Sequence, residues 1–205
     1  MIDAYDWARG CEALLRFGTP GGPRVIASPA LFEEANRTRA FLVAILRGLA
    51  RRGVEAWLPD LPGTGESVIA AADVTLVDWR EAYAALAIDS YALSIRGGAL
   101  MPGLMRGHWQ LSPMSGIDVA RECRRLSALS EGSAMIPSAL VDEIAHAEIV
   151  EVSPTRVVRL ARDPRPADRV IDAAPLWRRA EPDNDPALAD ELAQDVADWI
   201  KQCGG

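Results

Sequence analysis

The most constraining feature of this sequence is an alternation of short apolar runs and amphipathic segments between residues 24 and 95. The runs at 24–28, 54–58 and 90–95 have the length and composition of buried strands. Between them, residues 38–52 and 74–88 have helical character, and no hairpin turn separates these successive runs. Strand–helix–strand order of this kind is typical of parallel βαβ units. The sequence therefore predicts an α/β fold with a mostly parallel sheet and helices on both faces.

The flanking segments are less regular. Residues 11–17 are expected to form the first strand, and 29–36 a long polar loop. Asn36 or Thr38 is expected to cap the helix that follows, and Gly53 to end it. The remaining expected elements are strands at 109–111 and 156–161, helices at 117–129, 138–146 and 186–200, and a loop at 130–137. Only about ten residues separate Ile95, the end of the preceding strand, from the strand expected at 109–111, which is the lower limit for a parallel crossover. Either the helix in that crossover is very short or the strand at 109–111 is misassigned.

Length and composition bound the class of protein. A chain of 205 residues is expected to form a single domain over residues 1–205. A net charge of −7 argues against a nucleic-acid partner. No apolar run reaches the ~20 residues of a membrane span, and the acidic N-terminus has no signal-peptide pattern. The 3 cysteines, odd in number and in no CxxC pattern, are typical of thiols in a reducing compartment. We expect a cytoplasmic protein without a metal site or a cofactor.

A glycine-rich break follows the strand expected at 90–95. In a parallel sheet the loops after strands meet at its carboxyl edge, so 29–36, 59–67 and 96–98 are expected to form the site. A sharp turn there, with small residues two places before and after its centre, is the nucleophile elbow of the α/β-hydrolases. Ser94 and Gly98 are the small flanks, which puts Arg96 at the centre. A guanidinium is always protonated and cannot attack a carbonyl.

Three segments, at 25–29, 52–67 and 94–99, resemble the α/β-hydrolase superfamily. More narrowly, residues 31–39 (Leu-Phe-Glu-Glu-Ala-Asn-Arg-Thr-Arg) are similar to a segment of the exosortase A system-associated hydrolases, which also carry an arginine at the elbow. Residues 109–116 and 175–177 resemble two further segments of that group. The resemblance implies a reduced α/β-hydrolase fold and an accessory role in exopolysaccharide and protein-sorting systems. Because this chain is short, the helix after the elbow and the cap region are expected to be trimmed.

The residues of a hydrolase triad are hard to find. A triad needs a nucleophile, a histidine and an acid, and in hydrolase order the histidine follows the last strand. The chain has only His108 and His146, and each is expected to be a surface or capping residue. Asp163 follows a predicted strand, as the acid would, but it has no histidine to orient and is expected to be a turn residue. The nucleophile candidates are Ser94, expected inside a strand, and Ser67, in a glycine-rich loop.

Arg96 allows two interpretations. With backbone N–H groups at the start of a helix, it would bind a carboxylate, phosphate or pyrophosphate of a small ligand. Alternatively it pairs with Glu33, Glu34 or Asp60, because a buried arginine must be paired. The expected ligand site consists of Leu31, Phe32, Glu33, Asp60, Arg96, Gly97 and Gly98.

Two functions follow. One is a non-catalytic α/β-hydrolase-like binding or accessory component; the other is an active ester or thioester hydrolase with an atypical site. Either would take a small anionic or acyl ligand, and a protein partner or a second copy of the chain stays open.

Overall fold

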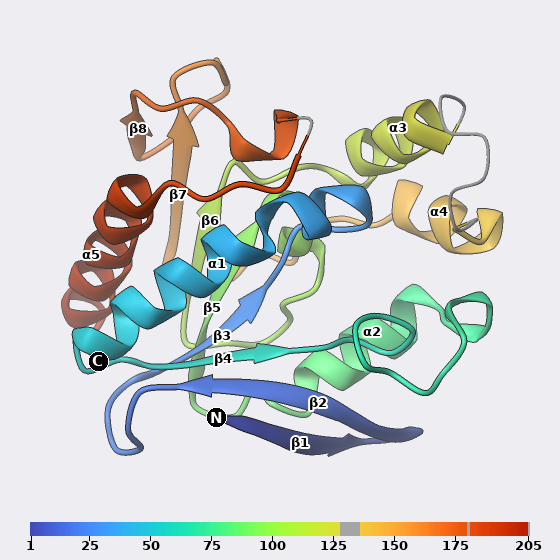
Figure 1. Ribbon diagram of the computed structural model, residues 1–205, viewed down its shortest axis with the longest axis horizontal. Helices are drawn as coiled ribbons and strands as arrows, with labels where there is room; N and C mark the ends of the chain where they lie inside the picture. The colour runs from blue at the N-terminus through green and yellow to red at the C-terminus, as the bar shows by residue number, and fades with distance from the viewer. Residues whose placement is uncertain (128–135, 180, 205) are drawn as a thin grey trace.

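The computed structural model describes residues 1–127, 136–179 and 181–204 (Figure 1). Its centre is an 8-stranded sheet in the order β1-β2-β4-β3-β5-β6-β7-β8. The strands are β1 (Ile2–Trp7), β2 (Gly10–Phe17), β3 (Arg24–Ser28), β4 (Glu55–Pro59), β5 (Ser90–Ile95), β6 (His108–Leu111), β7 (Thr155–Leu160) and β8 (Arg169–Ile171). Strands β3 to β8 are parallel to their neighbours within that set, and β1 and β2 are antiparallel. The predicted fold class is confirmed.

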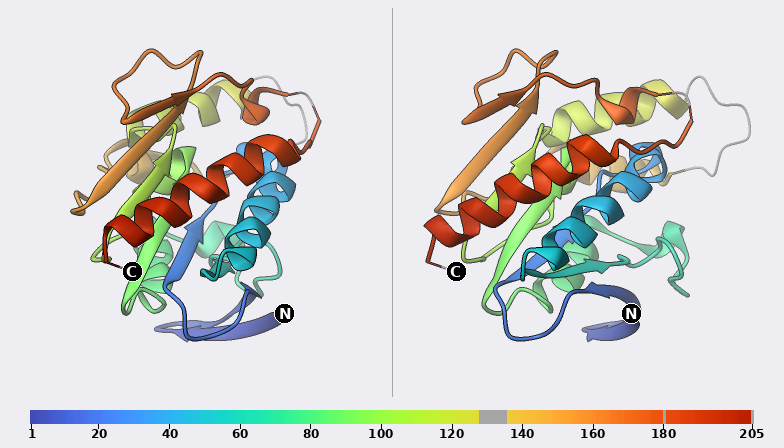
Figure 2. Two further views of the ribbon diagram at one scale, coloured as in Figure 1. Left: turned by 90° about the vertical axis from the view of Figure 1, so that its left-hand side faces the viewer. Right: turned by 60° about the vertical axis from the view of Figure 1, so that its left-hand side comes forward.

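Helices cover both faces of the sheet, as Figures 1 and 2 show. The helices are α1 (Glu33–Arg51), α2 (Leu76–Ala84), α3 (Gly116–Ser127), α4 (Ser138–Ala145) and α5 (Pro186–Gln202), with short 3-10 segments η1 (Ala71–Asp73), η2 (Arg96–Leu100) and η3 (Leu176–Arg178). Helices α1 and α5 lie side by side on one face, and α2 packs on the other. Among the described residues, no helix is both long enough and apolar enough to cross a bilayer.

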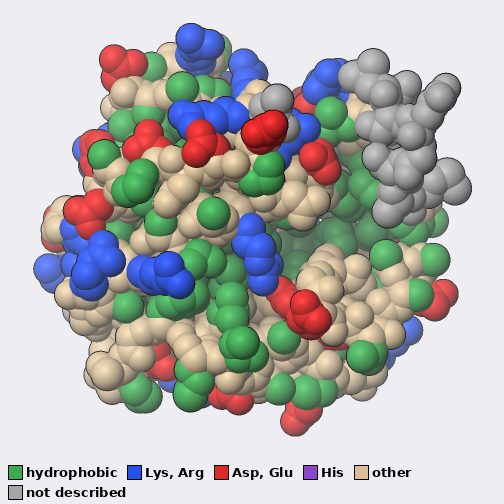
Figure 3. Space-filling model, viewed as in Figure 1, with side chains coloured by type: hydrophobic (Ala, Val, Ile, Leu, Met, Phe, Trp, Pro, Cys, Tyr) green, Lys and Arg blue, Asp and Glu red, His purple; other side chains and the backbone are tan. Residues whose placement is uncertain are grey.

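The stripe of apolar residues on α1 explains why that helix docks on the sheet. Every member of the stripe is fully buried: Phe41, Leu42, Ile45, Leu46 and Leu49. Burying each such side chain contributes roughly 1.5–3 kcal/mol. The outer side is solvated, with arginines beside acidic side chains over α1 and α5 (Figure 3). Two ion pairs, Arg51–Asp190 and Arg52–Asp190, join the helices there. As predicted, Gly53 ends α1; its φ of 79° suits a glycine.

The expected loop at 29–36 is wrong in its second half. Helix α1 begins at Glu33, so Asn36 and Thr38 both lie inside it and neither is the cap. The Thr38 hydroxyl donates to the carbonyl of Glu34 within the helix. The acidic first turn, Glu33 and Glu34, has no apolar periodicity, so the pattern hides it. Acidic side chains nevertheless favour this position, because the helix dipole is positive at the N-terminus.

Two strands were not predicted. Strand β1 forms a hairpin with β2, with Trp7 paired to Gly10 across a two-residue turn. Alternation of the buried aromatic residues Tyr5 and Trp7 with the exposed Ala4 and Asp6 was the available signal. Strand β8 has 3 residues, too few for any periodicity to show.

The structure shows which of the two alternatives holds for the short crossover after β5. The predicted strand at 109–111 exists as β6, and the segment before it contains only the 3-10 turn η2 in place of a full helix. The predicted helix at 74–88 is shorter, ending at Ala84. The loop expected at 130–137 and the end of the helix expected at 117–129 fall largely outside the described residues.

Candidate functional site

The turn after β5 has the geometry of an elbow. Arg96 has a φ of 56°, in the left-handed region that residues with a side chain rarely adopt. Gly98 lies against the end of β3: a Cβ there would be 2.2 Å from the carbonyl oxygen of Pro29. The hydroxyl of Ser28 also donates to the carbonyl of Gly98 at 2.9 Å. Only glycine fits at 98, which is the physical reason for a small flank at this turn.

Arg96, at the centre of this turn, is held by two neighbours. Its Nε and Nη2 donate to the two carboxylate oxygens of Glu34 at 3.1 and 3.0 Å. Its Cζ lies 4.7 Å from the centroid of the Trp177 ring, a cation–π arrangement. The side chains of Arg96 and Glu34 are only 11% and 12% exposed. Of the two interpretations of Arg96, internal pairing with a carboxylate is therefore present in the structure.

The other residues of the expected ligand site divide into two groups. Leu31, Phe32, Glu33 and Gly97 meet as expected, but the space they line with α3 holds only about 20 Å³, room for about one water. The carboxylate of Asp60 lies elsewhere: it pairs with Arg39 at 3.1 Å and accepts the backbone N–H of Glu66 at 3.2 Å.

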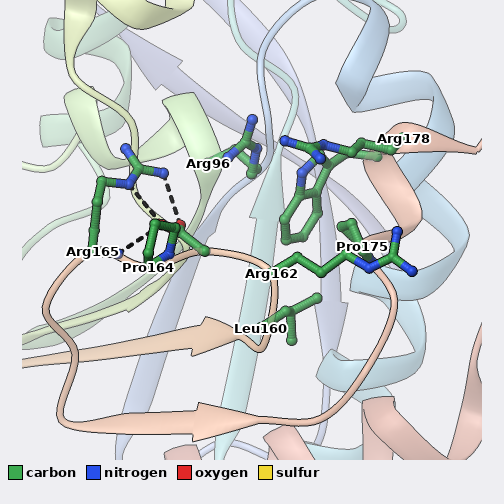
Figure 4. A pocket seen from close by; sticks show the side chains of 9 residues that line it. Arg96, Leu160, Arg162, Pro164, Arg165, Pro175 and Arg178 are labelled. Atoms are coloured by element: carbon green, nitrogen blue, oxygen red, sulfur yellow. Dashed lines mark hydrogen bonds and ion pairs between the residues drawn. The ribbon is translucent and has the colours of Figure 1, made fainter.

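A larger cavity opens on the other side of Arg96. It has a volume of about 320 Å³ and is bounded by the turn after β5 and the loops after β7 and β8 (Figure 4). Its lining residues are Arg96, Leu160, Arg162, Asp163, Pro164, Arg165, Pro175, Trp177 and Arg178. Of these lining residues, only Arg96 belongs to the ligand site expected from the sequence. The available signal for the rest of the lining was the pair of arginines, Arg162 and Arg165, that comes shortly after the strand expected at 156–161.

Asp163, at the acid position after β7, binds two arginines. It accepts from Nη1 of Arg159 at 2.7 Å and from Nε and Nη2 of Arg165 at 2.8 Å each. Burial raises the pKa of Asp163, but the hydrogen bonds from Arg165 and Arg159 outweigh that effect and hold the pKa well below its usual range. This carboxylate is therefore ionised and occupied by arginine at neutral pH.

The prediction for His108 is wrong, because this histidine is neither at the surface nor capping. Ser94 and His108 are both 0% exposed, and Ser94 Oγ lies 2.7 Å from His108 Nε2. The amide nitrogen of Gln110 lies 2.9 Å from Nδ1. Because an amide nitrogen only donates, Nδ1 accepts, and Nε2 carries the proton that Ser94 receives. Burial also lowers the pKa of His108 to about 4. In this arrangement the imidazole donates to Ser94 and does not act as its base.

Ser67 and His146 have local roles. The Ser67 hydroxyl accepts the backbone N–H groups of Gly63 at 2.9 Å and Ile69 at 3.2 Å, which fixes the glycine-rich loop. His146 follows α4 and is exposed, with Nδ1 2.8 Å from the carbonyl of Asp142, so its predicted capping position is confirmed. In the parts of the chain that the structure describes, no three His, Cys, Asp or Glu side chains cluster as metal ligands would.

Comparison with known proteins gives the class of fold. The sequence matches no protein-family model and no curated protein. Mouse alpha/beta hydrolase domain-containing protein 10 superposes with a TM-score of 0.66 at 16% identity, over 98% of this chain and 99% of that one. Est1E from Butyrivibrio proteoclasticus, with ferulic acid bound, gives 0.63 at 15% identity, over 93% and 95%. A haloalkane dehalogenase loop variant from Bradyrhizobium elkanii gives 0.61 at 12%, over 100% and 97%. The chain thus has the α/β-hydrolase fold.

Proposed function

We propose that this protein is a non-catalytic α/β-hydrolase-fold protein that binds a small anionic ligand at the carboxyl edge of its sheet. One observation supports this most directly: the centre of the elbow is Arg96, and its guanidinium is bound at two nitrogens by Glu34. A hydrolase of this fold places its attacking oxygen at the centre of the elbow. A permanently protonated group in that position removes the nucleophile.

The three hydrolase positions support the same proposal. In chain order a triad has its nucleophile, then its acid, then its histidine. Here those positions carry Arg96, an Asp163 that is occupied by two arginines, and a loop after β8 that supplies Trp177 and Arg178. These residues line one cavity, which is therefore the place for a ligand.

The proposed biological role is that of a cytoplasmic accessory component of an exopolysaccharide or exosortase-type system. Its support is the resemblance of residues 31–39, together with Arg96, to the exosortase A system-associated hydrolases. The structure adds a physical link between the two segments, because Glu34 from the first is the ion-pair partner of Arg96 from the second. The two parts of the resemblance are thus two halves of one interaction.

The second candidate is an ester or thioester hydrolase with an atypical site. The contact between Ser94 Oγ and His108 Nε2 at 2.7 Å is the observation in its favour. For catalysis, the segment that buries both residues would have to open and the imidazole would have to release its proton from Nε2.

A fluorophosphonate probe separates the two candidates. We expect no labelling of the protein, and no hydrolysis of short-chain p-nitrophenyl esters or of an acyl thioester above the buffer rate. An active serine hydrolase added to the same reaction serves as the positive control. Labelling that disappears in Ser94→Ala or Ser67→Ala would establish the hydrolase and refute the non-catalytic proposal.

A further inference from the structure

We propose that the cavity beside Arg96 binds a small organic molecule that carries a dianionic phosphate monoester. The inference deepens the proposed function, because it names the chemical class of the ligand at the site proposed above. It rests on the charges, the size and the apolar walls of this cavity.

The charge balance of the cavity favours a dianion. Four arginines line it. Arg96 is ion-paired with Glu34. Arg165 is ion-paired with Asp163, which it shares with Arg159, and also lies 3.9 Å from Asp118. Arg162 and Arg178 are exposed, and neither has an ion-pair partner among the residues that the structure describes. Glu122 acts on Arg178 through space but is itself ion-paired with Arg125. Two guanidinium groups at this cavity therefore lack a direct partner, in a protein whose net charge is −7. A ligand group with two negative charges would balance them.

The two arginines reach the cavity from different loops. Arg162 follows β7 and Arg178 follows β8, and in Figure 4 the side chain of Arg178 extends toward Arg96 while that of Arg162 runs past Pro175. Both are long, exposed side chains, so their guanidinium groups can turn toward a bound anion. The planar guanidinium fork matches pairs of phosphate oxygens and donates two parallel hydrogen bonds to them.

Size and wall chemistry indicate that the ligand is more than a free phosphate ion. A volume of about 320 Å³ lies at the lower end of the range for small-molecule sites. The remaining walls are apolar: Leu160, Pro164, Pro175 and Trp177. An apolar or planar organic group would bury these surfaces, whereas an inorganic ion would leave them in contact with water.

Calorimetric titration at pH 8 and low salt tests the inference with three probes: phenyl phosphate, phenyl sulfate and inorganic phosphate. Phenyl sulfate has the same ring and only one negative charge. We expect phenyl phosphate to bind at least about tenfold more tightly than either of the other two.

The variants Arg162→Gln and Arg178→Gln are each expected to weaken phenyl phosphate binding about tenfold, because each removes one charge-assisted contact. Arg47→Gln is the matched control: Arg47 is an exposed arginine of α1 without an ion-pair partner in the described ranges, and it lines a different hollow. The affinity of Arg47→Gln for phenyl phosphate should equal that of the parent protein.

Three results would overturn the inference: no binding of phenyl phosphate at millimolar concentration, equal affinity for phenyl sulfate, or unchanged binding in both cavity variants. None of these bears on catalysis, which the fluorophosphonate probe reports separately. Conversely, labelling of a serine would end the non-catalytic proposal while the measured affinity for the phosphate ester stood.

Discussion

The guanidinium of Arg96 and the carboxylate of Glu34 form a two-point ion pair between the turn after β5 and the first turn of α1. The pair joins residues 62 positions apart, and both side chains are nearly buried. Removing one partner of such a pair leaves an uncompensated charge in a poorly solvated place. Arg96, at the centre of the turn after β5, therefore stabilises the framework and also forms part of the cavity wall.

Replacing Arg96 with Met should lower the free energy of unfolding by about 3 kcal/mol, because Glu34 is left buried and unpaired. Urea unfolding at pH 7 measures this. The double variant Arg96→Met/Glu34→Gln is the informative comparison and should recover part of the loss, since neither charge then remains. The single variant Glu34→Gln completes the comparison. If the free energies of unfolding lost in Arg96→Met and in Glu34→Gln simply add in the double variant, the two side chains do not stabilise each other.

Gly98→Ala should destabilise the protein by about 3 kcal/mol, because overpacking against backbone has no flexible side chain to displace. The added Cβ would lie 2.2 Å from the carbonyl oxygen of Pro29 and 2.4 Å from that of Ser28. Gly103→Ala is the matched control, with no atom within 4 Å of its Cβ, and should change stability by less than about 0.5 kcal/mol. Equal melting temperatures for the two variants would contradict the tight approach of η2 to the end of β3.

His108 should make the protein less stable in mild acid. Burial lowers its pKa from 6.5 to about 4. Between these pH values His108 is therefore protonated in the unfolded chain and neutral in the folded chain. Its contribution to stability is thus complete above pH 6.5 and declines as the pH falls toward 4, by up to about 3 kcal/mol.

Urea unfolding of His108→Gln across this range checks the effect, because the variant should lack that part of the slope. His146→Gln replaces the other of the 2 histidines, which is exposed, and should retain the parent's slope. A parent-like slope in His108→Gln would show that His108 titrates freely.

Asp195 on α5 should contribute stability that disappears at low pH. It accepts hydrogen bonds from Trp109 of β6, Arg156 of β7 and Arg169 of β8, and its side chain is 4% exposed. Burial raises its pKa, but the bonds from Arg156, Arg169 and Trp109 outweigh this and lower the pKa to about 2. Because the folded pKa is depressed, the contribution is present above about pH 4 and is lost as the pH falls toward 2.

Asp195→Asn should therefore lose about 2 kcal/mol at pH 7 relative to the parent, and the difference should shrink as the pH approaches 2. Unfolding midpoints at several pH values provide the measurement. Asp198→Asn, on the same helix with a side chain 49% exposed, is the control and should differ little from the parent. If the difference in the free energy of unfolding between Asp195→Asn and the parent stays constant down to pH 2, the ionised carboxylate of Asp195 is not the source of this stability.

The central part of the fold was predictable because it depends on local patterns. The strands at 24–28, 54–58 and 90–95 and the buried face of α1 show directly in the spacing of apolar residues, and each is present. The hairpin strand β1 was missed because only two of its side chains, Tyr5 and Trp7, are buried, and the first turn of α1 because it begins with two glutamates. Strand β8 forms by pairing with β7, and a strand of 3 residues is too short for its sequence to show the periodicity of a strand.

The sequence by itself determined that Arg96 stands at the centre of a sharp turn after a buried strand, because side-chain size and spacing act over a few residues. Only the tertiary structure decided that Glu34 is its partner, that His108 is buried against Ser94, and that the loops after β7 and β8 enclose a cavity. The physical reason is that ion pairing, desolvation and cavity shape depend on groups brought together from distant parts of the chain. The same sequence pattern is compatible with several pairings between distant residues, such as Arg96 with Glu33, Glu34 or Asp60. Which pairing forms depends on the positions that the assembled sheet gives these residues.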